Sequence, residues 1–262
     1  MTDADLWKHW HEQRTETAAA PYGPLALTGT HWLSDHADGH LPNLPGQWRE
    51  SADGTGIVLT ASAADGLALD GKPLDGEARL GADTGAVAAS RLALGERRLV
   101  VLVREGLWAV RDFDPGSAAR AAFRGIDATA YDARWSVPGR FTPYGESRTV
   151  RVGNADGAER GLGLDGELAF EIEGVAHTLQ VTVEGDGSLW AVFADATSGT
   201  SSHRFRFLRP AAPDADGRTT VDFNRSLLPP CAFADHFLCP FPPPGNTLDA
   251  EIAAGERNLI RR

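Results

Sequence analysis

Hydrophobic and polar residues follow two different periods along the chain. Near the N-terminus, Leu6, Trp7 and Trp10 recur at helical spacing behind Thr2 or Asp3, whose side chains can accept hydrogen bonds from a first helical turn. The pattern predicts one N-terminal helix that docks through its aromatic stripe and covers the edge or end of a sheet.

Beyond residue 20 the period changes to that of short strands. The runs are rich in β-branched and aromatic residues, often alternate, and are separated by glycine-containing turns. The predicted strands are residues 24–34, 56–62, 66–70, 98–105, 107–112, 148–153, 166–174, 175–184, 188–195, 203–208 and 218–224. At Glu105-Gly106 and at 185–187, residues that tolerate positive φ suit hairpin reversals.

These patterns predict a mainly β fold. Because no helical period follows residue 20, a parallel sheet with a helix after each strand is disfavoured. We predict an antiparallel β-barrel or β-sandwich with an N-terminal helix and a Pro-rich, irregular C-terminal segment. The expected organisation is a helix at 1–20, a β subdomain at 21–135 and a second at 136–262, or one continuous β domain. A region with a weaker secondary-structure pattern, 112–139, divides the chain roughly in half.

Charge and motif content narrow the classes of function. The formal net charge is −11 with no long Lys/Arg run, so neither nucleic acid nor an anionic membrane is an expected partner. The chain has no apolar run long enough to suggest a spanning helix and no signal-like N-terminus, and we expect a cytoplasmic protein. We find no G-x-S-x-G, P-loop, dinucleotide or H-E-x-x-H motif, and we expect no cofactor.

The segment 222–246 is the first candidate for a site. In a strand over 218–224, Asp222 and Asn224 share one face and Arg225 stands at the end, so a carboxylate, an amide and a guanidinium converge before a Pro-rich loop. Such a group could bind a polar ligand. It could equally satisfy the backbone of the irregular loop, which remains an open alternative.

Other polar residues extend this candidate site. Asp195 opens a predicted Asx or Ser/Thr turn in "DATSGTSS". Arg204 follows that turn and Asn246 closes the Pro-rich segment, and we count all three with the ligand-binding candidates. Asp222 and Glu256 are the candidates for a catalytic base.

Both cysteines lie inside the same segment. Cys231 and Cys239, with His236 between them, lack the paired short spacings of structural zinc, and we expect no metal site. Buried structural thiols are favoured over a disulfide across the loop. A nucleophilic cysteine is the third alternative and would need a neighbouring base, for which His236 is a nominal candidate.

The order of these motifs resembles a known family. "TGTHWLSD", "REGLWAVRD", "FADATSGT", "DFNRSLLPPCAF", "CPFPPPGNTL" and "IAAGER" are similar to the bacterial and archaeal family called domain of unknown function 1684. The resemblance implies no activity. It implies that the family motif includes Asp195, Thr197, Ser198, Gly199, Asp222, Phe223, Asn224, Arg225, Pro230, Cys231, Cys239, Pro240, Asn246 and Glu256. The chain departs from the family at 201–203, where Ser-Ser-His replaces a usual Thr-Tyr and glycines.

Three functions follow from these features as hypotheses. The favoured one is binding of a small polar or amphipathic ligand in a β-barrel or β-sandwich pocket. The second is a hydrolase or isomerase that uses the Asp/Asn/Arg cluster. The third is an assembly module in which the polar clusters only brace loops. The oligomeric state is open.

Overall fold

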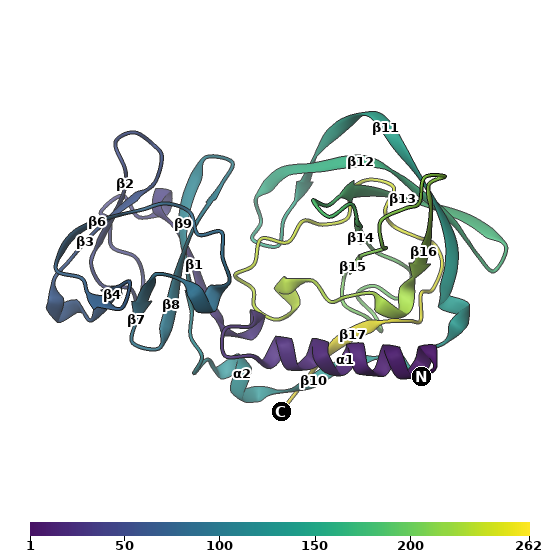
Figure 1. The fold of residues 1–262 in the computed structure, drawn as a ribbon, viewed down its shortest axis with the longest axis horizontal. Coiled ribbons are helices and arrows are strands. Elements are labelled where there is room, and N and C mark those ends of the chain that lie inside the picture. The colour runs from purple at the N-terminus through teal and green to yellow at the C-terminus, as the bar shows by residue number, and fades with distance from the viewer. The chain divides into compact units, whose positions relative to one another are not determined.

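The computed structural model describes residues 1–262 and shows a mainly β, antiparallel protein, as predicted (Figure 1). The chain divides into two compact units. One comprises Ala18–Ala122, and the other combines Met1–Thr17 with Phe123–Arg262. The change from one unit to the other at residue 122 falls inside the region with a weaker secondary-structure pattern, 112–139.

The unit of residues 18–122 contains two antiparallel sheets. Its strands are β1 (Leu27–Trp32), β2 (Gln47–Glu50), β3 (Ile57–Ala61), β4 (Leu67–Leu69), β5 (Lys72–Pro73), β6 (Gly76–Leu80), β7 (Leu92–Leu94), β8 (Arg97–Arg104) and β9 (Leu107–Phe113). One sheet has the order β1-β9-β8-β7-β4-β5 and the other β2-β3-β6. Their apolar side chains form a common core that includes Trp48, Leu59, Leu99 and Val110. A short helix, α2 (Ala118–Ala122), ends this unit.

The second unit is built on one six-stranded sheet and a two-stranded ribbon. Its strands are β10 (Phe123–Ala128), β11 (Ser136–Gly153), β12 (Glu159–Ile172), β13 (Val175–Val183), β14 (Leu189–Phe193), β15 (Arg206–Leu208), β16 (Arg218–Asp222) and β17 (Glu256–Arg261). The sheet order is β15-β14-β13-β12-β11-β16, and β10 pairs with β17. The long β11 and β12 arch over the C-terminal segment as a half-barrel (Figure 1).

The hydrophobic core of this unit lies between the sheet and the irregular C-terminal segment. Leu168, Leu179 and Val181 of the sheet form one cluster with Phe223 and Ile252, all of them buried. Every second residue of β12 is buried, and Leu168, Phe170 and Ile172 of its second half lie in this core. The irregular C-terminal segment therefore packs against the sheet and completes this core.

The N-terminal helix, α1 (Asp3–Ala19), begins with a capping box. The Asp5 amide donates to Thr2 Oγ1 (3.2 Å), and the Thr2 amide donates to the Asp5 carboxylate (2.8 Å). Trp7 and Trp10 are half-buried, and Trp7 Nε1 donates to the carbonyl of Asn224 (2.7 Å). The predicted docking by tryptophans is confirmed, whereas Leu6 remains 40% exposed.

The predicted hairpin at Glu105-Gly106 is confirmed. Both residues have positive φ, and β8 and β9 pair on either side of them. The predicted strand at 218–224 is wrong at its end, because β16 stops at Asp222 and a 3-10 turn follows.

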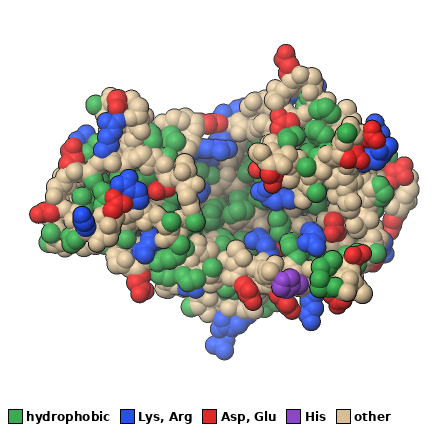
Figure 2. All heavy atoms as spheres, viewed as in Figure 1, with side chains coloured by type: hydrophobic (Ala, Val, Ile, Leu, Met, Phe, Trp, Pro, Cys, Tyr) green, Lys and Arg blue, Asp and Glu red, His purple; other side chains and the backbone are tan.

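No helix in the structure combines the length and the apolar character required to cross a membrane. On the face drawn in Figure 2, acidic and basic side chains are interspersed. This is the distribution expected where opposite charges pair across neighbouring strands.

Candidate functional site

The predicted Asp/Asn/Arg cluster does converge. Asp222 caps the 3-10 turn Phe223–Arg225, and its Oδ1 accepts hydrogen bonds from the Asn224 amide (3.1 Å) and from Asn224 Nδ2 (2.9 Å). Its Oδ2 lies 3.3 Å from Nε of Arg225. The Arg225 guanidinium is stacked over Trp10 of α1, 5.3 Å from the ring centre. The three head groups thus bind one another and the helix.

Both polar atoms of the Asn224 side chain are hydrogen-bonded in this arrangement. The residue is fully buried, its Oδ1 accepts the Asp132 amide (3.0 Å), and its Nδ2 donates to the Asp132 carbonyl (3.0 Å). Its own carbonyl accepts Trp7 Nε1. The side chain of Asn224 therefore joins the end of β16 to the loop before β11, and its backbone carbonyl holds helix α1, which is a bracing role.

The Asn224→Ala variant is expected to lose about 1–3 kcal/mol of unfolding free energy, because the partly buried amide and carbonyl of Asp132 lose their partners. Urea unfolding followed by tryptophan fluorescence measures this loss. Asn258→Ala is the matched control, since Asn258 is exposed, and it should change stability by less than about 0.5 kcal/mol. Equal effects of the two substitutions would contradict the bracing role.

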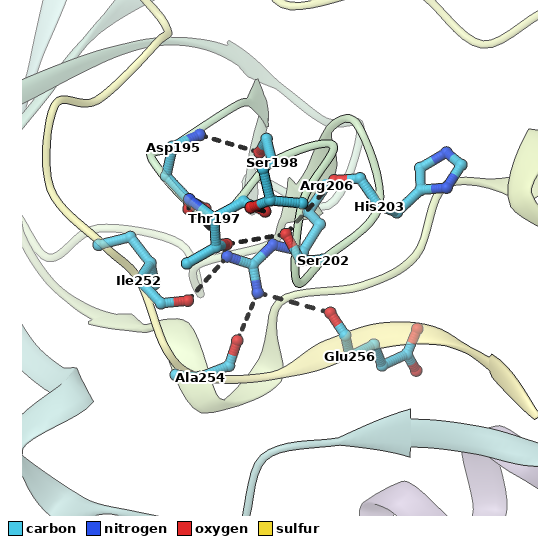
Figure 3. Close-up of polar contacts among 10 residues, drawn as sticks. Asp195, Thr197, Ser198, Ser202, His203, Arg206, Ile252, Ala254 and Glu256 are labelled. Atoms are coloured by element: carbon cyan, nitrogen blue, oxygen red, sulfur yellow. Dashed lines mark hydrogen bonds and ion pairs between the residues drawn. The ribbon is translucent and has the colours of Figure 1, made fainter.

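Asp195 belongs to a second buried network (Figure 3). It forms an ion pair with Arg206 (2.5 Å), and both side chains are fully buried. The Asp195 Oδ1 accepts the amide and hydroxyl of Thr197 (2.7 and 2.6 Å), and Ser202 continues the chain of hydroxyls at 2.8 Å. The predicted turn thus exists, but the cation that it holds is Arg206, which the sequence reasoning missed.

Arg206 clamps the C-terminal segment to β15. Its guanidinium donates to the carbonyls of Ile252 (3.0 Å) and Ala254, while that of Glu256 lies 3.5 Å away. Burial lowers the pKa of Arg206, and the Asp195 carboxylate opposes this effect. The network has no exposed atom of Asp195 or Arg206 to offer a ligand.

Asn246 and Glu256 are also fully buried. Asn246 Oδ1 accepts the Gln180 amide (2.8 Å), and its Nδ2 donates to the carbonyls of Gln180 and Val192 (2.9 Å each). Glu256 accepts the Leu228 amide (2.7 Å) and lies 3.0 Å from Nε of Arg14. Burial raises the pKa of Glu256, and Arg14 opposes the rise. Both residues tie the C-terminal segment to neighbouring elements.

Arg204 lies beside Phe241 and Cys231, apart from the buried networks described above. It is exposed, and its guanidinium lies over the ring of Phe241 (4.7 Å). It also lies beside the thiol of Cys231, together with His203. Cys231 and Cys239 are buried free thiols, and the Cys231 amide donates to Cys239 Sγ at 3.2 Å. The structure brings Arg204 to the cysteines and separates it from the Asp222 cluster.

A groove in the second unit offers the space that these clusters lack. It encloses about 710 Å³ where the start of β11 diverges from the end of β12 and the start of β13. Its apolar lining comes from Val137, Pro138, Ala169, Phe170 and Ala176. Its charged and polar lining comes from Arg140, Glu171, His177, Thr178 and Arg218.

Strand register explains how these residues meet. Arg140 on β11 lies opposite both Ala169 of β12 and Arg218 of β16, so the two arginines are cross-strand neighbours. On the adjacent row His177 stacks on Phe170, with ring centres 5.8 Å apart. Pairing stops at Gly139 on the β12 side but continues to Ser136 on the β16 side, and this divergence opens the groove.

Sequence reasoning did not include Arg140, His177 or Arg218 among the site residues. They lie on three strands and are dispersed over about 80 positions, with no local motif around them. Arg218 also contacts Asp216, and its Nη1 lies 3.8 Å from Asp214, so its charge is partly compensated. The groove therefore combines an apolar wall with two guanidinium groups, an imidazole and one carboxylate.

Comparisons with known proteins show a family and similarity to solved structures. The family model described as "Protein of unknown function (DUF1684)" matches residues 121–257, a range that contains the D-F-N-R motif but not the N-terminal stretches at 28–35 and 104–112. An NMR structure of an uncharacterized protein of Haloarcula marismortui is 29% identical, covering 52% of this chain and 77% of that one, with a TM-score of 0.43. The search of curated proteins returns no match.

Proposed function

The chain belongs to the DUF1684 family of proteins of unknown function, and we propose that it binds a small amphipathic anion in the groove between β11, β12 and β13. The observation that carries the proposal is the pairing of Arg140 and Arg218 across strands beside an apolar wall. The volume of about 710 Å³ lies in the range of small-molecule sites, which are mostly apolar with a few converging polar groups.

Charge and shape define the class of ligand. A carboxylate, sulfonate or phosphate accepts charge-assisted hydrogen bonds from guanidinium groups, and Arg140 and Arg218 present two of them. An aromatic or aliphatic body would cover Val137 and Pro138 and reach the stacked rings of Phe170 and His177. Glu171 on the same wall disfavours a ligand with negative charge at both ends.

Catalysis by Asp222 or Glu256 is less well supported. Glu256 is fully buried and already accepts the Leu228 amide, while Asp222 is engaged by Asn224 and Arg225. A general base has to reach the proton that it abstracts, and neither residue lines the groove.

The probe anilinonaphthalene sulfonate, an aromatic anion, tests the proposal by fluorescence titration. We expect Arg140→Gln to weaken binding about tenfold, which corresponds to the loss of about 1.4 kcal/mol from one charge-assisted hydrogen bond. Ala176→Trp should abolish binding, because Ala176 is exposed and lines the groove, so a larger side chain fills it.

The matched control is Arg209→Gln, because Arg209 is an exposed arginine of the same unit outside the groove. It should bind the probe as the unchanged protein does. Thermal unfolding of each variant verifies that the fold is intact. If the probe binds equally to all variants, the groove is not its site and the proposal fails.

A further inference from the structure

The fold places the two cysteines against each other. Cys231 lies in a 3-10 turn, Pro230–Ala232, and its backbone N–H donates to Cys239 Sγ at 3.2 Å. Both are free thiols, 6% and 5% exposed, and their side chains are hydrogen-bonded to each other. Seven residues separate them along the chain, so their contact depends on the path of the loop.

That path is fixed at both ends. The Cys239 carbonyl accepts the Ala155 amide (2.9 Å), and the preceding carbonyl, of Leu238, accepts Asn154 Nδ2 (2.9 Å). Around Cys231, the Phe233 amide closes the turn on the Pro230 carbonyl (3.0 Å). Both sulfurs also pack in a cluster with Val192, Phe205 and Phe207. The thiols are therefore presented to each other by the folded chain.

The surroundings of Cys231 favour its thiolate. The side chains of His203 and Arg204 lie beside the sulfur, and the His203 ring points away from the Arg206 network (Figure 3). The hydrogen bond from the Cys239 thiol lowers the pKa of Cys231 and burial opposes this; with the contributions of His203 and Arg204, which also lower it, the pKa is about 5. A thiolate with a second thiol in contact is the arrangement of redox-sensitive cysteine pairs.

We propose that Cys231 and Cys239 are a peroxide-sensitive dithiol, in which Cys231 is oxidised and Cys239 resolves the product to a disulfide. The inference is independent of ligand binding in the groove, because neither cysteine lines it. The small exposure of both sulfurs restricts the oxidant to the size of hydrogen peroxide.

The chemistry balances with hydrogen peroxide as the only oxidant. The Cys231 thiolate attacks one peroxide oxygen, the O–O bond breaks, and the leaving hydroxide takes a proton to become water. The sulfur, now oxidised, is a sulfenic acid. The Cys239 sulfur then attacks it, the S–O bond breaks as the S–S bond forms, and the proton of the Cys239 thiol leaves with the hydroxide as a second water.

The experiment treats the folded protein with hydrogen peroxide and measures mass and free thiols after quenching. The unchanged protein should lose both thiols and about 2 Da of mass, the two hydrogens of disulfide formation. Its midpoint of thermal unfolding should rise by about 5 °C or more, because the bond removes conformational entropy from the unfolded chain. Dithiothreitol should reverse both changes.

Two single variants test which cysteine is oxidised first and which one resolves the sulfenic acid. Cys239→Ser should stop at the sulfenic acid, which dimedone captures on Cys231 once the oxidised protein is unfolded in urea, and Cys231→Ser should react at least about tenfold more slowly. Oxidised glutathione, too large for the buried sulfurs, should leave the folded protein unchanged. Two free thiols persisting in peroxide would overturn the proposal, and equal rates in the two variants would overturn the assignment of Cys231 as the attacking thiol.

Discussion

Replacing Asp195 by alanine is expected to lower the free energy of unfolding by about 3–5 kcal/mol, the largest effect of any single substitution considered. Asp195 and Arg206 are both fully buried, and the substitution leaves a cation without its counter-ion in the core. It also removes the acceptor of two hydrogen bonds from Thr197. Urea unfolding of the variant measures the loss, which is a large fraction of the stability of an ordinary domain.

A double variant and a surface control make this prediction specific. Arg206→Met combined with Asp195→Ala should recover part of the loss, because the pair is removed together and no buried charge remains. Glu184→Ala breaks an exposed pair with Arg209 and should cost less than about 1 kcal/mol. A loss below about 1 kcal/mol for Asp195→Ala would show that Arg206 reaches water, contrary to the structure.

Replacing Arg14 by methionine is expected to cost about 3 kcal/mol at pH 7, since it leaves Glu256 buried without its cation. Methionine retains apolar contact with Phe233, over which the Arg14 guanidinium lies. The residue sits on α1, so the prediction also tests whether the helix is held by charge as well as by Trp7.

The unfolding free energy lost in Arg14→Met should depend on pH in a defined direction. Burial raises the pKa of Glu256 in the folded state above its ordinary value in the unfolded chain, and removal of Arg14 raises it further. A carboxyl of this kind binds its proton more tightly when folded, so stability is retained below the unfolded pKa and lost as pH rises through the folded pKa. The deficit of Arg14→Met should therefore shrink as pH falls.

Glu256→Gln in the Arg14→Met background is the control for this assignment. The amide cannot ionise, so the additional pH dependence should disappear and part of the stability should return. If the deficit of Arg14→Met is the same at every pH from 4 to 8, Glu256 is not the titrating group.

The strands that the sequence predicts correctly are those whose own residues alternate and end in a clear turn. The alternation and the Glu105-Gly106 turn mark β8 and β9 within a few residues of their bounds. The first half of β11 was missed because Pro138 and Pro143 interrupt its pattern. Pro138 lies where β11 pairs with β16 alone, and Pro143 borders a break in register, so neither removes a central hydrogen bond.

The candidate site was predictable only where its residues are neighbours in sequence. The convergence of Asp222, Asn224 and Arg225 follows from the end of one strand. The hydrogen bonds of Asn224 with Asp132 and Trp7, however, join residues more than 90 positions apart in the chain, so no local pattern predicts them. Asp195 and Arg206 are close in sequence, but their pairing depends on the register of β14 and β15, which the spacing does not reveal.

An amide NMR titration of the folded protein with anilinonaphthalene sulfonate distinguishes the groove from residues 222–246 as the ligand site. If the groove is the ligand site and residues 222–246 are framework, the largest shift changes should fall at 139–140, 169–178 and Arg218. Largest changes within 222–246, with the groove unaffected, would instead assign the ligand site to the Asp/Asn/Arg cluster.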